Sequence, residues 1–493
     1  MTITMDALFS HPGRLFIDGE WVSPAGGTSI AVVDSTTEEV FLRVAEANAA
    51  DMDRAVAAAR RAFDDGPWPR LTHAERATYL RAFADGWRRH VKSVSQLWPR
   101  EAGIVARAAL ASTERGIKEW EDTADLAESF PFTEVMTPGN GGAFGLVRRE
   151  PVGVVGAIIP WNAPMPSLTH KIAPALLAGC TVILKTAPEA PGEGFLAAQI
   201  AEDIGLPPGV RNVVAADRQV SELLVRDPRV DKISFTGSTA AGRRIASLCG
   251  DRVARYSLEL GGKSVAVILD DADIARSAAT ISAAECALTG QVCYSLTRLV
   301  VLERQHDAFV EALASALAGV KIGDPYADGT QMGPLASEQQ RSRVEGYIST
   351  GIAQGAKLVS GGGRPRDLDR GFFVEPTVFG RVDNDHTIAR EEIFGPVLSV
   401  IPAADEAAAI RIANDTVYGL NASVFTADAE RALQVAAQLR SGTVGHNAVR
   451  SDLTLGFGGF KQSGIGREGG VEGLRQFLES KAVILDETPS SYA

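Results

Sequence analysis

The residue of this 493-residue chain that could most directly do chemistry is Cys293, in the segment Thr289–Arg298. The segment runs from Gly290, a residue typical of a helix end, to the apolar, β-prone run Leu299–Leu302. A thiol at such a junction lies near backbone N–H groups, which can stabilise a thiolate and, later in a reaction, an oxyanion. A lone cysteine is also often a small buried apolar residue. If Cys293 is a nucleophile, other parts of the chain must supply a base, an oxyanion donor and a cofactor site.

Two residues at predicted strand ends could supply the oxyanion donor and the base. Asn162 follows the apolar run Val154–Ile159 and stands in the sequence Pro-Trp-Asn-Ala-Pro, so a rigid backbone would hold its amide donor. The alternative for Asn162 is a turn-forming asparagine. Glu259 lies between two leucines, and such an apolar setting raises the pKa of a carboxyl and suits a general base. The alternative for Glu259 is an ion pair with Lys263.

Turns after other predicted strands could bind a cofactor. Lys185 ends one strand and could reach a ribose hydroxyl or a phosphate, or could be a solvent-facing cap. Gly237 and Ser238 precede a helix whose N-terminus suits a pyrophosphate, although the turn lacks the G-x-G-x-x-G fingerprint. Glu392 offers a further carboxylate beside a rigid Phe-Gly-Pro turn. The glycine-rich stretch Gly456–Glu468 indicates a loop whose backbone approaches something closely.

Alternating strands and helices would position these residues. Strands alternating with helices predict a doubly wound parallel sheet from Val152 onwards, and ligands of such sheets bind at the carboxyl ends of the strands. A second α/β region is predicted from about Ser264. The strands expected in the first region are Val152–Ile159, Cys180–Leu184, Val210–Val214, Lys232–Phe235 and Ser257–Leu260, and those in the second include Val265–Leu269, Leu299–Leu302 and Val397–Ile401.

The first 150 residues predict covering and edge elements. Leu15–Trp21 alternates apolar residues around Asp-Gly and predicts a hairpin. Asp53–Phe63 and Ala74–His90 are predicted helices that cover another layer. A second hairpin, Phe132–Arg149, has little sequence with which to build its own core, so its edges need a partner. This suggests an oligomer-forming arm, with a plain surface hairpin as the alternative.

Composition and charge indicate a globular chain of about two or three domains. Hydrophobic residues make up 45% and charged residues 22% of the chain, as in ordinary soluble proteins. The net charge of −12, from 49 basic and 61 acidic residues, argues against a nucleic-acid partner, because phosphate binding needs a basic surface.

Targeting and cysteine usage favour a cytoplasmic location. Met1–Glu20 lacks a continuous apolar core and does not look like a secretory signal. The most apolar stretch, Ile172–Leu184, contains Pro174 and Gly179 and is shorter than the ~20 residues that a bilayer needs, so we expect no membrane partner. The four cysteines form no Cys-x-x-Cys pair and the seven histidines are scattered, so neither a disulfide framework nor a metal site is expected.

Taken together and in this order, the motifs resemble the NAD(P)-dependent aldehyde dehydrogenase superfamily over nearly the whole chain. The resemblance implies an NAD(P)-binding domain of residues 1–131 and 150–261, a catalytic domain of residues 262–476, and a small β oligomerisation arm of residues 132–149 and 477–493. It also implies a small-molecule aldehyde as substrate and a homodimer or homotetramer. Because CoA-acylating members generally lack the glutamate that Glu259 matches, the hydrolytic type is favoured.

The resemblance implies a role for each matching residue. Cys293 would be the nucleophile, Asn162 and the Cys293 N–H would form the oxyanion hole, and Glu259 would activate water to hydrolyse a thioester left after hydride transfer. Lys171 would help to relay protons. The implied cofactor-binding residues are Ile158, Pro160, Trp161, Lys185, Gly237, Ser238, Leu260, Glu392 and Phe394. The implied substrate-tunnel residues are Ala163, Tyr294, His446 and Phe457.

Departures from the family pattern leave the cofactor and the substrate open. The usual Lys-Pro-x-Glu reads Lys-Thr-Ala-Pro from Lys185, with Glu189 one place late. NAD is favoured, while NADP or dual use stays open. Ala163 replaces a bulky aromatic and hints at a wider tunnel and a larger substrate, and His446 and Gly456 also depart from the pattern. A non-catalytic binding protein and an esterase are the alternative functions.

Overall fold

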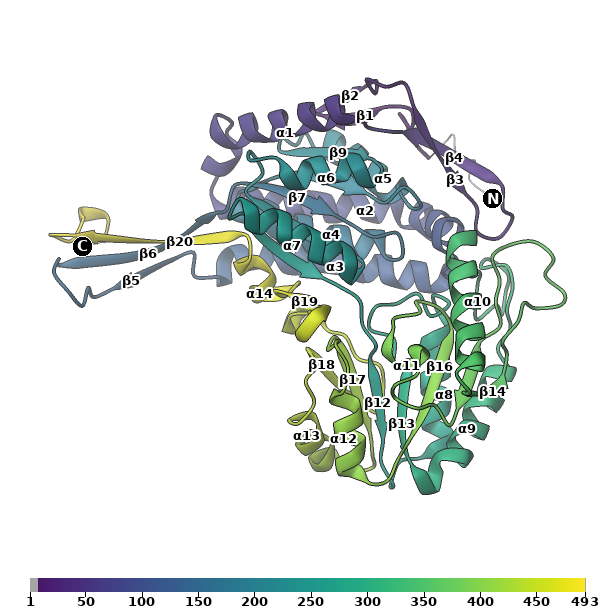
Figure 1. Ribbon diagram of the computed structural model, residues 1–493. Coiled ribbons are helices and arrows are strands. Elements are labelled where there is room, and N and C mark those ends of the chain that lie inside the picture. Colours follow the sequence, from purple (N-terminus) through teal and green to yellow (C-terminus); the bar gives the residue numbers. More distant parts are fainter. Residues whose placement is uncertain (1–7, 493) are drawn as a thin grey trace.

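The computed structural model describes residues 8–492, so Met1–Ala7 of the predicted cofactor domain and Ala493 of the predicted arm lie outside the described residues. Two α/β bodies stand one above the other, and a narrow β arm projects from one side (Figure 1). The chain passes from the first body to the second between β11 (Arg255–Glu259) and β12 (Val265–Ile268). The predicted α/β fold with a β arm is confirmed.

The first body is built on an eight-stranded sheet in the order β19-β11-β10-β7-β8-β9-β1-β2. Its five central strands are parallel, and the chain leaves β7 in one direction towards β8 and β9 and later returns on the other side to β10 and β11. Such a reversal opens a crevice at the carboxyl ends of the strands. The strands are β7 (Val154–Ile158), β8 (Thr181–Thr186), β9 (Arg211–Ala215), β10 (Lys232–Thr236) and β11, with the antiparallel edge strands β1 (Leu15–Ile17), β2 (Glu20–Val22) and β19 (Gly464–Ile465).

Helices cover both faces of this sheet. Side chains of neighbouring strand positions point to opposite faces, so the apolar runs of the strands supply two cores. One face carries α2 (His73–Ala102), α3 (Ala106–Ser129), α4 (Pro164–Ala178) and α5 (Gly192–Asp203). The other carries α1 (Ala49–Asp64), α6 (Arg218–Arg226) and α7 (Thr239–Asp251). The predicted hairpin Leu15–Trp21 and both predicted helices are present, and α2 continues beyond His90 through Pro99 to Ala102.

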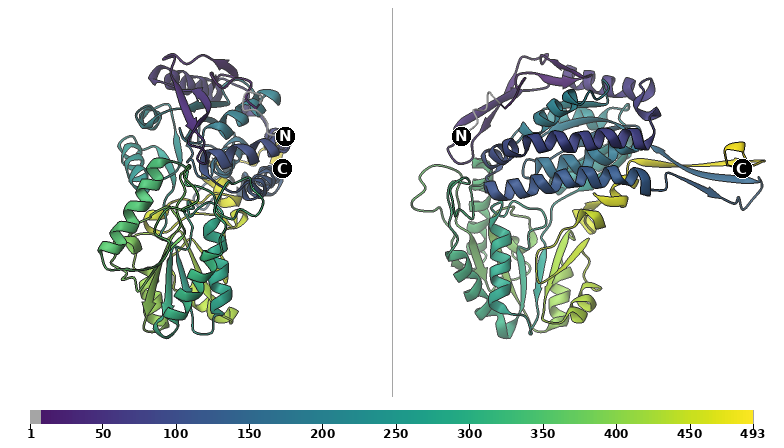
Figure 2. Two further views of the ribbon diagram at one scale, coloured as in Figure 1. Left: turned by 90° about the vertical axis from the view of Figure 1, so that its right-hand side faces the viewer. Right: turned by 180° about the vertical axis from the view of Figure 1, so that it is seen from behind.

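Helix α3 was not predicted from the sequence. It lies alongside α2, as the view from behind shows (Figure 2). Its buried stripe is narrow and includes Gly116, a residue of low helix propensity. A Cβ at Gly116 would collide with the sulfur of Met165, so the glycine permits the close approach of α4. A glycine inside a helix is unfavourable in the local sequence, and only its contact with α4 in the folded protein explains it.

The second body is a seven-stranded sheet in the order β14-β15-β16-β13-β12-β17-β18, parallel except for β14. Helices α8 and α9 cover one face, and α10 to α13 cover the other. Its further strands are β13 (Arg298–Leu302), β14 (Lys357–Ser360), β15 (Thr377–Gly380), β16 (Val397–Ala403), β17 (Asn421–Phe425) and β18 (Thr443–His446). Its helices are α8 (Ile274–Cys286), α9 (Glu303–Ala318), α10 (Glu338–Ala353), α11 (Thr387–Arg390), α12 (Glu406–Asn414) and α13 (Ala429–Ala436).

The arm is a three-stranded antiparallel sheet of β5 (Thr133–Met136), β6 (Phe144–Pro151) and β20 (Leu478–Leu485). Strand β20 pairs with β6 along its whole length, so both chain segments predicted for the arm meet there. The arm extends away from the body in Figure 1 and in the right-hand view of Figure 2. Val135, Met136 and Ile484 each expose more than half of their surface on it.

The segment that returns from the second body to the arm belongs by contact to the first body. Strand β19 pairs with β11, and α14 (Gly470–Arg475) packs against α4, although both fall in the predicted catalytic domain of residues 262–476. The remaining elements are the hairpin β3 (Ser29–Val33) and β4 (Val40–Ala45) and the short turns Trp68–Arg70, Leu453–Leu455, Lys461–Ser463 and Ser490–Tyr492. Among residues 8–492, no helix is both long and apolar enough to cross a membrane.

Candidate active site

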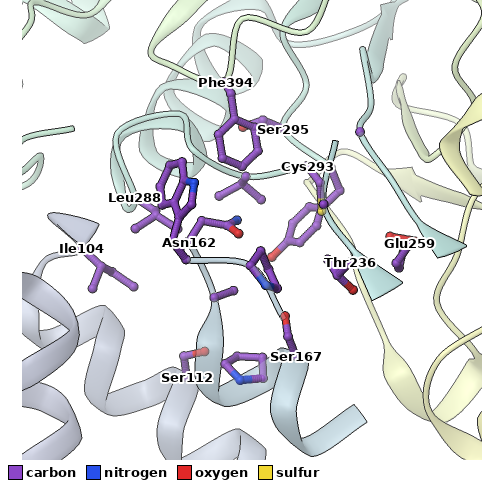
Figure 3. A pocket seen from close by; sticks show the side chains of 18 of the residues that line it. Ile104, Ser112, Asn162, Ser167, Thr236, Glu259, Leu288, Cys293, Ser295 and Phe394 are labelled. Atoms are coloured by element: carbon purple, nitrogen blue, oxygen red, sulfur yellow. The ribbon is translucent and has the colours of Figure 1, made fainter. Parts of the chain in front are cut away.

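A cavity of about 830 Å³ lies where the two bodies meet, at the carboxyl ends of β7, β10 and β11. Cys293, Asn162 and Glu259 all line it (Figure 3). Residues that are far apart in the sequence therefore line the same cavity. We name two halves of this cavity. The strand-side half is lined by Pro160, Trp161, Glu189, Thr236, Gly237, Ser238, Leu260, Gly261, Glu392 and Phe394, and the helix-side half by Ser112, Arg115, Glu119, Ala163, Ser167, His170, Tyr294 and Phe457.

Cys293 lies in the connection between α8 and β13, at the junction of the two halves. The backbone turns through two left-handed residues, Thr289 and Gly290, with φ of 53° and 68°. A Cβ at Gly290 would collide with the backbone of Gly395, so this position needs glycine. The next residue, Gln291, is fully buried, and its side chain bonds to the backbone of Ala102, Leu288 and Ala336. These bonds hold the cysteine segment against α2 and the second body.

Asn162 is fixed beside this segment. Its Nδ2 donates to the backbone carbonyl of Gln291 at 2.9 Å, and its own carbonyl accepts from Trp98 Nε1 at 3.0 Å. A side-chain amide has two N–H donors, so one remains for another acceptor. Pro164 begins α4 directly after the asparagine segment. The amide is therefore rigidly placed and partly free, as an oxyanion donor requires.

Glu259 ends β11 and is 4% exposed. Neither carboxylate oxygen has a hydrogen-bond partner among the described residues. The ion pair with Lys263 that the sequence left open is absent among these residues, since the buried Lys263 Nζ has no hydrogen-bond partner there either. Burial raises the pKa of Glu259 well above its usual value, and the charge of Glu468 raises it further. Glu259 has the environment of a carboxyl poised to take up a proton.

A charged cluster lies behind Glu259. His170 Nε2 lies 2.7 Å from Glu119 of α3, and its Nδ1 lies 3.7 Å from Glu468. The fully buried Lys171 forms an ion pair with the other oxygen of Glu468. Burial alone would raise the pKa of Glu468, but Lys171 and His170 together lower it to about 2. Burial would lower the pKa of His170, but the two carboxylates raise it to about 9.

Sequence reasoning selected Lys171 of this cluster and missed the other three residues. Glu468 ends the glycine-rich loop that was expected to approach something closely, so the loop itself was a signal. His170 directly precedes Lys171 in the sequence. No signal pointed to Glu119, because helix α3 was not predicted.

The thiol of Cys293 is partly exposed to the cavity. Burial raises its pKa well above the usual value, and the carboxyls of Glu259 and Glu392 raise it further, while the N–H of Cys293 itself lowers it. A thiol with a raised pKa is neutral at rest, and it would have to lose its proton to act as a nucleophile. The backbone N–H close to the sulfur is a second donor beside Asn162.

The strand-side half brings together most of the predicted cofactor residues. Ser238 caps α7, where its Oγ accepts from Ala241 N at 3.3 Å. The rings of Trp161 and Phe394 meet edge to face with centroids 5.4 Å apart, and Phe394 adopts a φ of 62°, which is uncommon for a bulky residue. Glu392 Oε1 accepts from Gly262 N at 3.0 Å, and burial raises its pKa to about 7.

Four predicted site residues do not line the cavity: Ile158, Lys171, Lys185 and His446. Ile158 lies just before the lining residue Pro160 and is buried. Lys185 lies beside Ile158 at the same edge of the sheet. Burial lowers the pKa of Lys185 to about 8, although the charge of Glu189 partly opposes this effect. His446 instead contacts the carbonyl of Thr426 at 3.1 Å, next to Asn447.

The helix-side half contains three of the four predicted tunnel residues. Ala163, Tyr294 and Phe457 line it, and the rings of Tyr294 and Phe457 meet edge to face at 5.8 Å. Helix α3 supplies Ser112, Arg115 and Glu119, which no sequence motif indicated. Figure 3 shows Ser112 reaching the cavity from the side away from Phe394.

A doubly wound sheet whose switch-point crevice opens into a cysteine-containing cavity is typical of an α/β enzyme that binds a dinucleotide. Comparison with known sequences defines the class further. The sequence model described as the aldehyde dehydrogenase family matches residues 21–483. The chain therefore belongs to the aldehyde dehydrogenase family, and it is an oxidoreductase of the kind that oxidises an aldehyde to a carboxylic acid with a nicotinamide cofactor.

Individual relatives cover nearly the whole chain. Geranial dehydrogenase of Castellaniella defragrans is 42% identical over 473 residues, 96% of this chain and 98% of that one. The 3-succinoylsemialdehyde-pyridine dehydrogenase of a Pseudomonas species is 41% identical over 476 residues, with the same coverage of each chain.

Solved structures of the family superimpose closely on the chain. An aldehyde dehydrogenase of Mycobacterium tuberculosis in complex with NAD+ has a TM-score of 0.94 at 42% identity, covering 98% of this chain and 99% of that one. A mutant of aldehyde dehydrogenase C of Pseudomonas syringae, in complex with NAD+ and octanal, has a TM-score of 0.93 at 39% identity, covering 97% and 98%.

Proposed function

We propose that the protein oxidises its aldehyde through a covalent intermediate on Cys293, which Glu259-activated water hydrolyses to the free acid. The observation that carries the proposal is the meeting of Cys293, Asn162 and Glu259 in one cavity, from three separate elements. Each has the environment that its role needs: a partly exposed thiol, a fixed amide with a free N–H, and a buried carboxyl without a hydrogen-bond partner among residues 8–492.

The first step is attack of the Cys293 sulfur on the aldehyde carbon. The partly exposed thiol passes its proton to solvent as the C–S bond forms, since the thiolate is the nucleophile. The carbonyl oxygen becomes an oxyanion, and the free N–H of Asn162 and the N–H of Cys293 donate to it. Both donors are held by backbone contacts before the substrate binds, so little reorganisation is needed.

The last step is hydrolysis of the thioester left on Cys293. Glu259 takes a proton from water as the water oxygen attacks the thioester carbon, and the C–S bond breaks to release the acid and the thiol. The raised pKa of Glu259 suits this base, because a carboxyl of ordinary pKa is too weak to take a proton from water efficiently. Glu468 and Lys171 lie behind Glu259 and would pass the proton onward.

The strand-side half fits a nicotinamide cofactor. A Cβ at Gly261 would collide with the Glu392 carboxylate, so the glycine lets this carboxylate lie against the backbone just beyond β11. Ser238 and the N-terminus of α7 would hold the pyrophosphate, Lys185 a ribose, and Glu392 and Phe394 the nicotinamide end. When bound, the cofactor would accept the hydride from the substrate carbon.

We infer that NAD is preferred over NADP. Glu189 lines the strand-side half, and its charge acts on Lys185, although it stands one place later than the family pattern. A carboxylate at this edge would accept from a ribose hydroxyl and would repel a 2′-phosphate. The NAD+ complexes of the M. tuberculosis and P. syringae relatives support the same preference.

The division of the chain and its assembly are part of the proposal. Residues 1–131 and 150–261 would bind the cofactor, residues 262–476 would supply the nucleophile, and the arm of residues 132–149 and 477–493 would join subunits of a homodimer or homotetramer. The exposed apolar residues of the arm support a role in assembly. We propose that the enzyme acts in the cytoplasm, where its four free cysteines would stay reduced.

Two variants test the chemistry. A panel of aliphatic, aromatic and semialdehyde substrates with NAD and NADP, read by absorbance of the reduced cofactor, first identifies a substrate. Cys293→Ala should abolish cofactor reduction. Glu259→Gln should keep a single burst of reduced cofactor but lose steady-state turnover, because hydride transfer precedes hydrolysis. Wild-type turnover in Cys293→Ala would remove the proposed nucleophile, and unchanged steady-state turnover in Glu259→Gln would remove the proposed base.

A further inference from the structure

We propose that Arg115 forms a subsite for a carboxylate at the far end of the substrate, so that the preferred substrate class is an aldehyde that also carries a carboxylate. This inference rests on the proposed function, since it takes Cys293 as the end of the cavity where the aldehyde reacts. It concerns the helix-side half, which the catalytic chemistry leaves unexplained.

Arg115 faces the cavity from a stripe of α3. Residues Ala108, Ser112, Arg115 and Glu119 are spaced by three or four positions, so they share one face of the helix, and all four line the cavity. Arg115 itself is exposed, which places it towards the solvent-facing part of this half. Glu119 lies deeper, where it contacts His170.

Among the charged side chains around the helix-side half, Arg115 differs from Glu119 and Glu468 in having no ion-pair partner among residues 8–492. Glu119 pairs with His170 at 2.7 Å, and Glu468 pairs with Lys171. In contrast, no carboxylate of residues 8–492 lies within 4.0 Å of the Arg115 guanidinium, and no hydrogen bond joins it to another described residue. Other cations of the same helix are engaged: Lys118 pairs with Asp122, and Arg107 donates to the carbonyl of Thr330 at 2.5 Å.

The path from Cys293 to Arg115 runs past Tyr294. Tyr294 follows the nucleophile in the chain, lines the same half, and packs against Phe457. Burial raises the pKa of the Tyr294 phenol, and the charge of Arg115, which lines the same cavity, opposes this rise. A chain of methylene groups would pass the two rings, and a terminal carboxylate would then meet the guanidinium and the phenol.

The chemistry of the pair selects an anion. A guanidinium offers two parallel N–H donors that match the two oxygens of a carboxylate, and a phenol can donate one more hydrogen bond. An ammonium group on the substrate would be repelled by Arg115, and a hydrocarbon end would form no hydrogen bond with either polar group. The cavity is therefore asymmetric for its substrate, with the rings of Tyr294 and Phe457 between a reactive end and a cationic end.

The test uses three aldehydes of equal chain length that end in a methyl, a carboxylate or an ammonium group, with octanal as the methyl-ended member. The wild-type enzyme should prefer the carboxylate over octanal by about tenfold in kcat/KM, the size expected of one charge-assisted hydrogen-bonded contact. Arg115→Gln should remove that preference, and Arg115→Glu should shift it towards the ammonium. Arg115→Lys, which keeps the charge, should retain part of it. Lys118→Gln removes a cation of the same helix outside the cavity and should leave the preference unchanged.

Several outcomes would overturn the inference. One is a wild-type enzyme that oxidises octanal and its carboxylate analogue equally well. Another is an Arg115→Gln variant that loses activity equally on both, because a purely structural role would act on every substrate. Both results leave the proposed function intact. If the wild-type enzyme reduced no cofactor with any aldehyde, the proposed function would fail first, and that result is distinguishable because it appears before any variant is compared.

Discussion

The strand-side half of the cavity is formed largely by the ends of parallel strands, whereas the helix-side half is formed largely by side chains of α3 and α4. Strands β7, β8, β10 and β11 are hydrogen-bonded along their lengths, so their carboxyl ends cannot shift independently. The residues of α3 reach the cavity only because the whole helix packs on α2 and α4. One half is positioned by a backbone network, and the other by the contacts of side chains.

Because the two halves are positioned differently, we expect the strand-side half to carry the chemistry that relatives share and the helix-side half to set substrate selectivity. A substitution on the cavity face of α3 changes the lining without breaking a strand ladder, so the helix-side half can vary while the strand-side half stays in place. The relatives are named for different aldehydes, geranial and a succinoyl-pyridine semialdehyde, at 42% and 41% identity.

The largest expected effect is at the junction of the two halves. Asn162→Ala removes the amide donor and should lower kcat about a hundredfold to a thousandfold, with a smaller change in KM, because the donor acts on charge that develops in the transition state. Steady-state kinetics with any accepted aldehyde would measure this. A tenfold rise in KM with kcat unchanged would instead place Asn162 in ground-state binding.

The charged cluster behind Glu259 should dominate acid stability. Glu468 has a folded-state pKa of about 2, below its ordinary value, so its stabilising contribution is present above about pH 4.5 and is lost as the pH falls towards 2. Glu468→Gln leaves Lys171 buried without its partner and should cost about 3 kcal/mol at pH 7, with a weaker acid dependence of the midpoint of urea unfolding. An identical acid dependence in both proteins would contradict this assignment.

The contribution of His170 to the free energy of unfolding should be lost at high pH, whereas that of Glu468 is lost at low pH. Its folded-state pKa of about 9 is raised, so its contribution is fully present below about pH 6.5 and is lost as the pH rises through 9. His170→Gln should therefore flatten the loss of stability between these pH values. The measurement is the free energy of unfolding at pH 6, 7.5 and 9, with Glu128→Gln, an exposed change on α3, as the control.

A smaller effect is expected in the strand-side half. Glu189→Gln removes the carboxylate near Lys185 and should raise kcat/KM for NADP relative to NAD by about tenfold, because one like-charge repulsion is lost. The ratio of the two cofactors at a fixed aldehyde concentration measures the change. No change in this ratio would show that Glu189 does not discriminate the 2′-phosphate.

The smallest effect concerns the width of the helix-side half. Ala163 lines the cavity beside Asn162, so Ala163→Phe should lower kcat/KM for bulky aldehydes several-fold while short aldehydes are little affected. Comparison of acetaldehyde with octanal separates the two. An equal loss on both would indicate that the substitution disturbs Asn162 rather than the space for the substrate.

The strand-side half and the position of the proposed nucleophile were largely predictable from the sequence. Strands alternate with helices in the order that the structure shows, and Asn162, Lys185, Ser238 and Glu259 each stand at or just beyond the end of an apolar run. Because parallel strands align their carboxyl ends, the position of each residue along its own strand already predicts that these residues gather at one edge.

The helix-side half was not predictable in the same way. The sequence of α3 carries no side-chain cap at its N-terminus, and its Gly116 is explained only by Met165 of α4. The place of His446 away from the cavity likewise depends on a contact with Thr426 in a neighbouring connection. Distances between elements that share no hydrogen-bond ladder are not encoded in local spacing.

The amino-acid sequence by itself determined the alternating α/β architecture and the set Cys293, Asn162 and Glu259, because periodic apolar runs and rigid turns act within a few residues of one another. Only the tertiary structure decided that Glu259 has no ion pair with Lys263, that His170 lies between Glu119 and Glu468, and that Arg115 faces the cavity. The pairing of charges depends on which distant helices pack together, and packing is decided by the shape of the whole core.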